Sequence, residues 1–297
     1  MTSADEAASA GLVKVGGRPS LRDYLAEVWR RRSFIFSMAR FKIESENQKN
    51  SLGMFWVILK PLLNALIYGA VFGFLIGGIK PPHFVEFLII GIFVFEFFAS
   101  SWTAGGRAIT SNAALVQSLS FPRMVLPLAA VVQQFLKFIP TVVIMLVFLV
   151  VMGHTPDVQW LLIVPLFALL VVFNCGLALI TARLCVHWRD LNNFLPFVTR
   201  FFFYTSGIFF SIEERFGPRP PSDIEPEGFA GVPWLVTLTD YQPIHEFLSL
   251  SRSALLEGRG YGINTTYLLY ASVWSVVLLV FGIWFFWRAE ERYGRVD

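Results

Sequence analysis

Apolar stretches long enough to cross a bilayer recur along this sequence, separated by polar connections of uneven length. A helix rises 1.5 Å per residue, so about 20 apolar residues are needed to cross a hydrocarbon core of ~30 Å. The stretches of this length are residues 55–79, 84–102, 131–152, 160–182, 194–212 and 266–287. The pattern therefore predicts an all-α polytopic membrane protein with six transmembrane helices.

Composition supports a membrane protein and argues against several other classes. The 297 residues are 55% hydrophobic and 15% charged, against about 25% charged in soluble domains. A net charge of +3 without a basic stripe predicts no nucleic-acid partner. Cys175 and Cys185 lie ~15 Å apart along a helix, too far for a disulfide. The four histidines are scattered in the sequence, so we expect no metal site.

The distribution of basic residues predicts the orientation. An even number of spans places both termini on one side of the membrane. Most of the 24 Lys and Arg precede the first span, lie in the 2–3 and 4–5 connections, or follow the sixth span. The positive-inside rule places these segments, and hence both termini, in the cytoplasm. Residues 1–54 contain no apolar core ahead of a cleavage site, so no signal peptide is expected.

The residues before the first span divide into two parts. Residues 1–19 are small and polar, and we expect a mobile tail. Residues 20–54 are predicted to form cytoplasmic interfacial and gate helices, beginning with a capping box from Ser20 to Asp23. Apolar residues then recur at helical spacing, as expected for an amphipathic helix in the membrane interface. These are Leu21, Tyr24, Leu25, Val28 and Trp29. A helix packed against a protein surface is the alternative.

Residues 213–265 form a long external loop before the sixth span. Its first half is acidic and rich in proline, whereas its second half is more apolar but too short to cross the membrane. Irregular backbone is not tolerated against lipid, so the apolar part predicts a re-entrant hairpin shielded by the other helices. Residues 288–297 are expected to form a cytoplasmic tail.

Two cytoplasmic connections have the features of docking surfaces. Residues 111–117 predict a short helix with a capping-type start, and Pro122 and Pro127 predict a bent entry into the third span. The 4–5 connection is shorter and carries Arg189 and Asp190. Short polar helices on the cytoplasmic side of a polytopic protein favour contact with a soluble partner.

Several of these local motifs occur together in one family. Leu52-Gly53, Trp56 and Pro61 open the first span, and Arg189-Asp190-Leu191 follows the fourth. Between them come Asn112-Ala113-Ala114-Leu115-Val116, Phe121-Pro122-Arg123 and Leu126-Pro127. Over residues 20–290 the chain resembles the permease subunits of type-2 ABC exporters, particularly exporters of lipid-linked polysaccharides such as O-antigen, teichoic acid, capsule and galactan. Glu96 and the Pro-rich segment 218–226 depart from the expected pattern.

The resemblance implies a transport subunit in a bacterial plasma membrane. It would form a homodimer, bind two ATP-binding-cassette ATPase subunits, and move a lipid-linked polysaccharide from the cytoplasmic face to the outer face. The sequence has no G-x-x-x-x-G-K-[ST] motif. We therefore expect a non-enzymatic chain without cofactors, with ATP and Mg²⁺ on the partner ATPase. The alternatives are an exporter of a drug or small lipid and, with less support, a membrane glycosyl or phosphosugar transferase.

Three groups of candidate site residues follow. The coupling candidates, in the two cytoplasmic connections, are Ser111, Asn112, Leu115, Val116, Gln117, Phe121, Pro122, Arg123, Arg189 and Asp190. Polar residues within spans are costly and usually functional, so the channel or substrate candidates are Glu96, Lys60, Asn64, Lys137 and Arg200. The candidates for a diphosphate or lipid contact at the cytoplasmic interface are Arg40, Lys42 and Lys49. For the basic residues, snorkelling or attraction to anionic lipid is the alternative.

The topology can be tested with single cysteines and a membrane-impermeant thiol reagent in intact cells. Asp157→Cys and Ser222→Cys should be labelled because both positions are predicted outside, whereas Ser118→Cys should remain unlabelled. The parent chain, which has only Cys175 and Cys185, provides the background. Labelling at position 118 would overturn the orientation.

Overall fold

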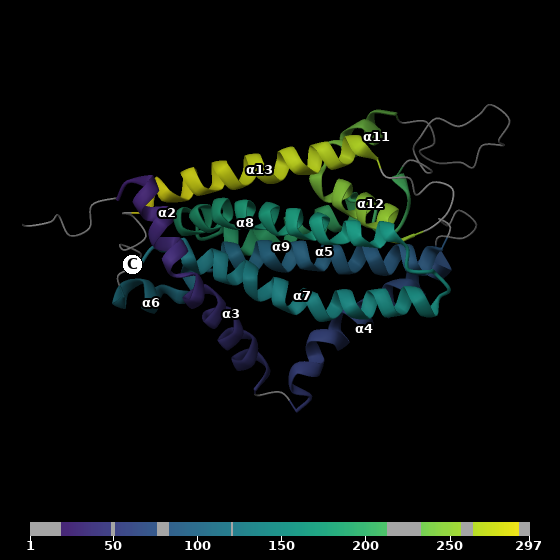
Figure 1. The fold of residues 1–297 in the computed structure, drawn as a ribbon, viewed down its shortest axis with the longest axis horizontal. Helices are drawn as coiled ribbons and strands as arrows, with labels where there is room; N and C mark the ends of the chain where they lie inside the picture. The colour runs from purple at the N-terminus through teal and green to yellow at the C-terminus, as the bar shows by residue number, and fades with distance from the viewer. Residues whose placement is uncertain are drawn as a thin grey trace, which may run out of the picture.

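The structure, a computed structural model, describes residues 19–48, 51–75, 83–119, 121–212, 233–256 and 264–290. Throughout these ranges the chain is helical, without strands (Figure 1). The α-helices are α2 (Leu21–Arg30), α3 (Arg32–Asn47), α4 (Trp56–Leu75), α5 (Phe84–Gly106), α6 (Ala113–Ser118), α7 (Val125–Val151), α8 (Ile163–His187), α9 (Leu191–Thr205), α11 (Pro233–Asp240), α12 (Pro243–Leu255) and α13 (Thr265–Trp287). Among the 3₁₀ turns are η2 (Thr110–Asn112) and η3 (Val158–Leu162).

Among the described residues, four helical segments are long and apolar enough to cross a membrane. They are α5, α7, the continuous run Val158–His187 and α13. The described part of the first predicted span forms α4, an apolar helix whose start lies apart from the other long helices (Figure 1). The prediction of an all-helical membrane protein is therefore confirmed, whereas the number of six spans stays a prediction.

α5 is the central helix of the bundle. In its most apolar window 72% of the residues are buried within the chain, against 22% for α7 and 17% for α13. The latter two helices therefore leave most of their apolar surface for lipid or another protein. α8 and α13 pack backbone to backbone, because a Cβ atom built on Gly176 would lie 2.4 Å from the carbonyl carbon of Leu278. Glycine is required at that crossing.

The fifth predicted span is not one continuous helix. The apolar run 194–212 predicts a helix throughout, but α9 ends at Thr205 and the chain turns at Gly207, whose φ is +71°. The side chain of Arg252 on α12 donates to the carbonyl oxygens of Gly207 and Ile208 at 2.9 and 3.0 Å. The sequence pattern assigns Arg252 to a loop. In the structure its side chain is only 4% exposed, because it supplies hydrogen bonds to carbonyl oxygens that lose their helical partners where α9 ends.

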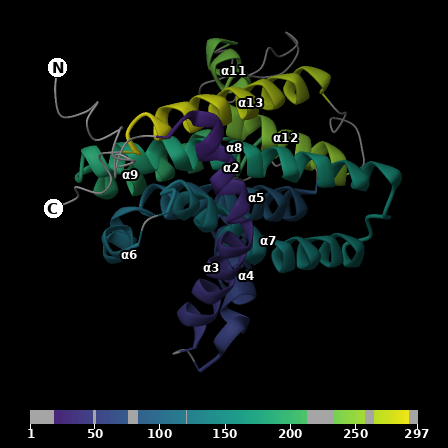
Figure 2. The ribbon, with the colours of Figure 1, turned by 60° about the vertical axis from the view of Figure 1, so that its left-hand side comes forward.

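The N-terminal helix docks on the end of the bundle that also carries α6 (Figures 1 and 2). Ser20 caps α2, as predicted, by accepting a hydrogen bond from the Asp23 backbone N–H at 3.2 Å. Tyr24 and Val28 are buried in a cluster with residues of α7 and α13, whereas Trp29 is 71% exposed. The centre of the apolar face therefore packs on protein, as the alternative expected, while the interfacial role of its exposed edge stays a prediction.

Two further expectations differ from the structure. Pro127 does not bend the chain ahead of the third span, because it lies in the first turn of α7, where a helix needs no donor from that residue. The capping-type start expected for residues 111–117 is not formed: no side chain caps α6, and that of Asn112 donates instead to the carbonyl of Ala108 at 2.6 Å. Residues 1–18, Lys49, the Pro-rich segment 218–226 and the tail from 291 onward lie outside the described residues.

Candidate functional site

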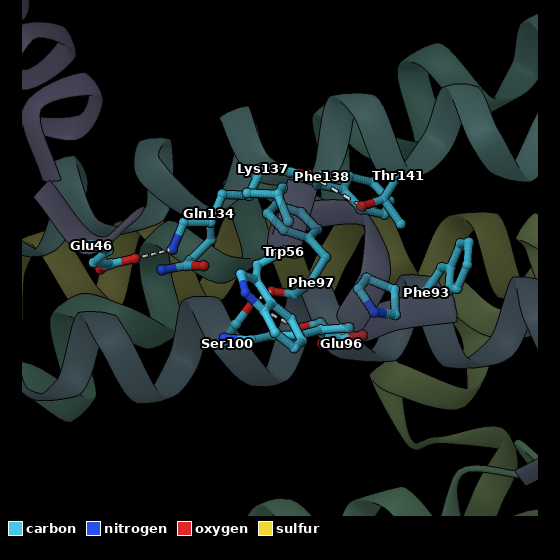
Figure 3. Close-up of a pocket in the computed structure, with 13 residues that line it drawn as sticks. Glu46, Trp56, Phe93, Glu96, Phe97, Ser100, Gln134, Lys137, Phe138 and Thr141 are labelled. Atoms are coloured by element: carbon cyan, nitrogen blue, oxygen red, sulfur yellow. Dashed lines mark hydrogen bonds and ion pairs between the residues drawn. The ribbon is translucent and has the colours of Figure 1, made fainter. Parts of the chain in front are cut away.

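A cavity of about 430 Å³ lies between α4, α5 and α7 and reaches the end of α3 (Figure 3). It brings together three of the predicted channel candidates, Lys60, Glu96 and Lys137. Its walls are mixed, since aromatic rings accompany these polar groups. The aromatic lining residues are Trp56, Phe93, Phe97 and Phe138. The cavity therefore offers stacking surfaces beside charged groups of both signs.

Glu46 of α3 lines this cavity and connects α3 to α7. Its carboxylate oxygens accept from Gln133 Nε2 at 2.7 Å and from Lys137 Nζ at 2.5 Å (Figure 3 shows the ion pair with Lys137). Lys137 is therefore paired within the chain and does not simply snorkel. The sequence does not single out Glu46, because it lies in a charged run and its partners are on another helix.

Glu96 lies between two cavities. A second one, of about 480 Å³, is lined by Glu96 and Arg200 together with Tyr68, Phe203 and Tyr204. Glu96 Oε2 is buried without a hydrogen-bond partner among the described residues. Arg200 thus shares a cavity with Glu96, as a common site requires.

Asn64 and the basic residues of α3 occupy different positions. Asn64 is half-buried on α4 and lines neither of these cavities. Arg40 lines a third cavity of about 550 Å³ that it shares with Glu44 and Lys137. Lys42 is half-buried on another face of α3, and burial lowers its pKa. Of Arg40 and Lys42, only Arg40 therefore lines that cavity.

The coupling candidates of the 2–3 connection are partly anchored and partly exposed. Val116 is 3% exposed and packs in the cluster that also buries Tyr24, which fixes α6 to the bundle. Leu115 is half-buried, while Ser111 and Gln117 are exposed. α6 therefore combines an anchored face with an accessible face, as a docking helix needs.

Residues 121–123 pack under the N-terminal helices. Phe121 lies against Phe34 of α3 with ring centroids 6.0 Å apart, and Pro122 is buried. Arg123 donates through Nη1 to the Glu290 carbonyl at 3.0 Å, and its backbone N–H donates to Glu290 Oε1 at 3.1 Å. Arg123 thus has an intramolecular partner that the sequence does not reveal.

Glu290 joins three segments that are distant in the sequence. Tyr24 donates its hydroxyl proton to Glu290 Oε2 at 2.7 Å, and the same hydroxyl oxygen accepts from the Met124 backbone N–H at 3.2 Å. Burial raises the pKa of Glu290, while hydrogen bonds from Tyr24 and Arg123 oppose the rise. The network ties α2 to the start of α7 and to the end of α13.

The 4–5 connection lies beside the 2–3 connection. Arg107, which follows α5, donates to the Asn192 carbonyl at 2.7 Å. Arg189 and Asp190 are exposed and line a surface groove of about 690 Å³ with Trp188 and other residues. The two predicted docking segments are thus linked directly.

The comparison with known proteins identifies the family. Residues 35–218 match the model of the ABC-2 type transporter family. The chain belongs to the ABC-2 type transporter family.

Three relatives extend the match across most of the chain. The O-antigen export system permease protein RfbA of Klebsiella pneumoniae is 30% identical over 250 residues, which cover 84% of this chain and 89% of that protein. A protein of the same name from Myxococcus xanthus is 24% identical and covers 73% of this chain and 82% of its own length. The polysialic acid transport protein KpsM of Escherichia coli is 23% identical, covering 84% of this chain and 91% of that protein.

The ABC-2 match includes both the cavities beside Glu96 and the 2–3 and 4–5 connections. Glu46, Lys60, Glu96 and Arg200 all lie between residues 35 and 218. Glu290 lies beyond that range. The cluster around Glu290 therefore joins the family region to the C-terminal end of the chain.

Replacing Glu290 by Gln should change how stability depends on pH. Because the folded pKa lies above the ordinary value of 4.5, protonation stabilises the folded state: the gain is complete below pH 4.5 and is lost as pH rises through the folded pKa. The stability of the wild type relative to Glu290→Gln should therefore fall from pH 4.5 upward, by at most about 1.4 kcal/mol per pH unit.

Thermal unfolding in detergent from pH 4.5 to 8 measures this difference. Glu44→Gln, which changes an exposed carboxylate on α3, is the control. A difference between wild type and Glu290→Gln that stays constant across the range would contradict the buried network.

Proposed function

We propose that this chain is the membrane-spanning permease subunit of an ATP-driven exporter that moves a lipid-linked polysaccharide from the cytoplasmic face to the outer face. The observation that carries the proposal is the similarity to an O-antigen export permease over 89% of that protein's length. The polar and aromatic cavities around Glu96 are consistent with it, because sugar rings stack on aromatic faces while their hydroxyl groups bind polar side chains.

The proposed topology has six crossings with both termini in the cytoplasm of a bacterial plasma membrane. α9 spans only ~22 Å at 1.5 Å per residue, so it does not cross a ~30 Å core alone. We assign the rest of the fifth crossing to the turn at Gly207 and the buried α12, with α11 and α12 as the re-entrant part. Arg252 makes this break tolerable, since irregular backbone at membrane depth must be satisfied by protein.

The proposed energy source is a separate ATP-binding-cassette subunit that binds ATP and Mg²⁺. Its contact would be the exposed side of α6, with a smaller contact at Arg189 and Asp190. Movement of α6 would reach the bundle through Val116 and through the link between Arg107 and Asn192. We propose a complex of two permeases and two ATPases.

The conduit would form between two copies of this chain. α9 exposes an aromatic stripe at helical spacing, and each member is more than half exposed. The stripe consists of Phe194, Phe197, Phe201 and Tyr204. In a homodimer this face would line the path together with Arg200, and the cavity around Glu96 would open toward it. Lipid would cover the remaining apolar faces.

Loading would begin at the cytoplasmic interface beside α3. The diphosphate of a lipid-linked glycan lies at headgroup depth, where Arg forms bidentate, charge-assisted hydrogen bonds. Arg40 fits this role because it is exposed and lines a cavity between α3, α4 and α7. Lys60 lines the neighbouring cavity and would take the next contact.

Deletion of the gene should leave the cell surface without the exported glycan, while its lipid-linked form accumulates inside. The wild-type chain should restore the surface glycan. Leu115→Asp should restore less than about a tenth of the wild-type amount, because a charge at this half-buried position disrupts the apolar part of the docking helix. Leu115→Met, which conserves volume and polarity, should retain export. Normal export by Leu115→Asp, at equal amounts of inserted protein, would refute the coupling assignment.

Replacing Glu96 by Leu should lower export at least several-fold without lowering stability. The carboxylate has a buried, unpartnered oxygen, so its removal relieves desolvation while it removes a polar group from both cavities. Export by the Glu96→Gln variant should lie between that of Glu96→Leu and that of the wild type. Surface glycan and thermal unfolding should be measured for each variant. Unchanged export in Glu96→Leu would exclude a transport role for this residue.

Arg40→Lys distinguishes diphosphate recognition from general attraction to anionic lipid. If Arg40 binds the diphosphate through its planar guanidinium, Lys should lower export several-fold, and Ala should lower it further. If Arg40 serves only surface attraction, worth about 1 kcal/mol, the Lys variant should be silent. Initial export rates at equal protein levels provide the measurement, and full activity in both variants would remove Arg40 from the site.

A further inference from the structure

Two histidines that are far apart in the sequence meet at the end of the bundle opposite Glu290. His83 lies at the start of α5 and His154 just beyond α7, and their ring centroids are 4.8 Å apart. Glu86 Oε1 lies 3.8 Å from His83 Nδ1 and 3.7 Å from His154 Nε2. The separation of the histidines in the sequence, on which the expectation of no metal site was based, therefore does not hold in space for this pair.

Burial makes this cluster more than a surface coincidence. Glu86 and His154 are only 8% and 7% exposed, whereas His83 has an exposed side. His154 Nε2 is buried without a hydrogen-bond partner among the described residues and lies near the Glu86 carboxylate. Without a bound cation, His154 Nε2 must carry a proton to lie beside this carboxylate; a cation between the Nε2 lone pair and the carboxylate satisfies both buried groups instead. The arrangement therefore suits a shared positively charged ligand.

The backbone fixes both histidines. His83 has a φ of +53°, in the left-handed region that residues other than glycine seldom adopt. Gly153, with a φ of +99°, closes α7 by donating to the Val150 carbonyl at 3.1 Å, and the His154 N–H donates to the Leu149 carbonyl at 3.0 Å. This pair of bonds is a Schellman motif, which holds His154 directly after the helix. Backbone strain beside a preformed cluster is typical of a ligand site.

We propose that His83, Glu86 and His154 bind one transition-metal dication, with Zn²⁺ the best fit. Tetrahedral Zn²⁺ has ligands at about 2.0–2.2 Å, so neighbouring ligand atoms lie about 3.3–3.5 Å apart. Here one donor atom from each residue lies within 4.8 Å of the others, and small side-chain movements close the remaining gap. The exposed side of His83 leaves a fourth position for water.

The donor set and the position define what the site does. Two imidazoles favour Zn²⁺ over Mg²⁺ and Ca²⁺, which prefer oxygen ligands. A bound ion would clamp the start of α5 to the chain leaving α7, at the end that the topology places outside the cell. The site is independent of the proposed export function, and it can be tested without a transport assay.

Isothermal titration of the full chain in nanodiscs, carrying an affinity tag without histidine, tests the proposal. ZnCl₂ should bind with one Zn²⁺ per chain, and MgCl₂ should not compete. His154→Ala should weaken binding by more than about 100-fold, and Glu86→Gln by about 10- to 100-fold. His187→Ala, which removes an exposed histidine at the end of α8, should bind like the wild type.

A second measurement compares the wild type with and without Zn²⁺, so that its main result does not depend on variants that fail to fold. Its unfolding midpoint should rise by about 5 °C in saturating ZnCl₂ relative to EDTA. A variant carrying both His83→Asn and His154→Ala should show no such shift, and Asn is chosen because it tolerates a positive φ. Absence of saturable Zn²⁺ binding by the wild type, or equal binding by the double variant, would overturn the proposal.

Discussion

The Glu290 carboxylate lies out of water where α2, the start of α7 and the end of α13 meet. Burying a charge is costly unless hydrogen bonds or opposite charge compensate for it, so this position requires all three segments at once. Tyr24 supplies a hydroxyl, and Arg123 supplies its backbone N–H and an ion pair at 3.5 Å. The docked N-terminal helix and the anchored α6 share the cluster around it. Any force on the 2–3 connection is therefore transmitted to a tightly connected end of the bundle.

Inside the bundle, too, buried polar groups need hydrogen-bond partners. α9 breaks at Gly207, and Arg252 binds the exposed carbonyls while it stacks on the Phe87 ring at 3.4 Å from the centroid. The absence of a Cβ on Gly91 gives its guanidinium room. In contrast, Glu96 has an unpartnered oxygen between two cavities. Arg252 thus satisfies a break in the backbone, whereas Glu96 is among the described residues with an unpartnered buried polar atom and faces the two cavities that we propose for transport.

The sequence predicts what depends on local pattern. The lengths of the apolar runs reveal α5, α7, α8 and α13. The capping box places the start of α2 at Ser20. Both features depend only on residues that are neighbours in the sequence. The sequence also identifies Lys60, Glu96 and Lys137, since polar residues are conspicuous within apolar runs. The break in α9 and the roles of Glu46, Arg252 and Glu290 were missed. Each depends on a partner from a distant segment, which periodicity does not report.

The most direct test of the export account is ATP-dependent translocation in proteoliposomes. Vesicles would contain this chain and its ATPase subunit with the nucleotide sites outside, and a lipid-linked glycan would be supplied in the outer leaflet. The account predicts that ATP and Mg²⁺ move the glycan to the lumen, where an added glycosidase no longer cleaves it. Neither subunit alone should do so. Equal protection with and without ATP in the complete system would contradict the account.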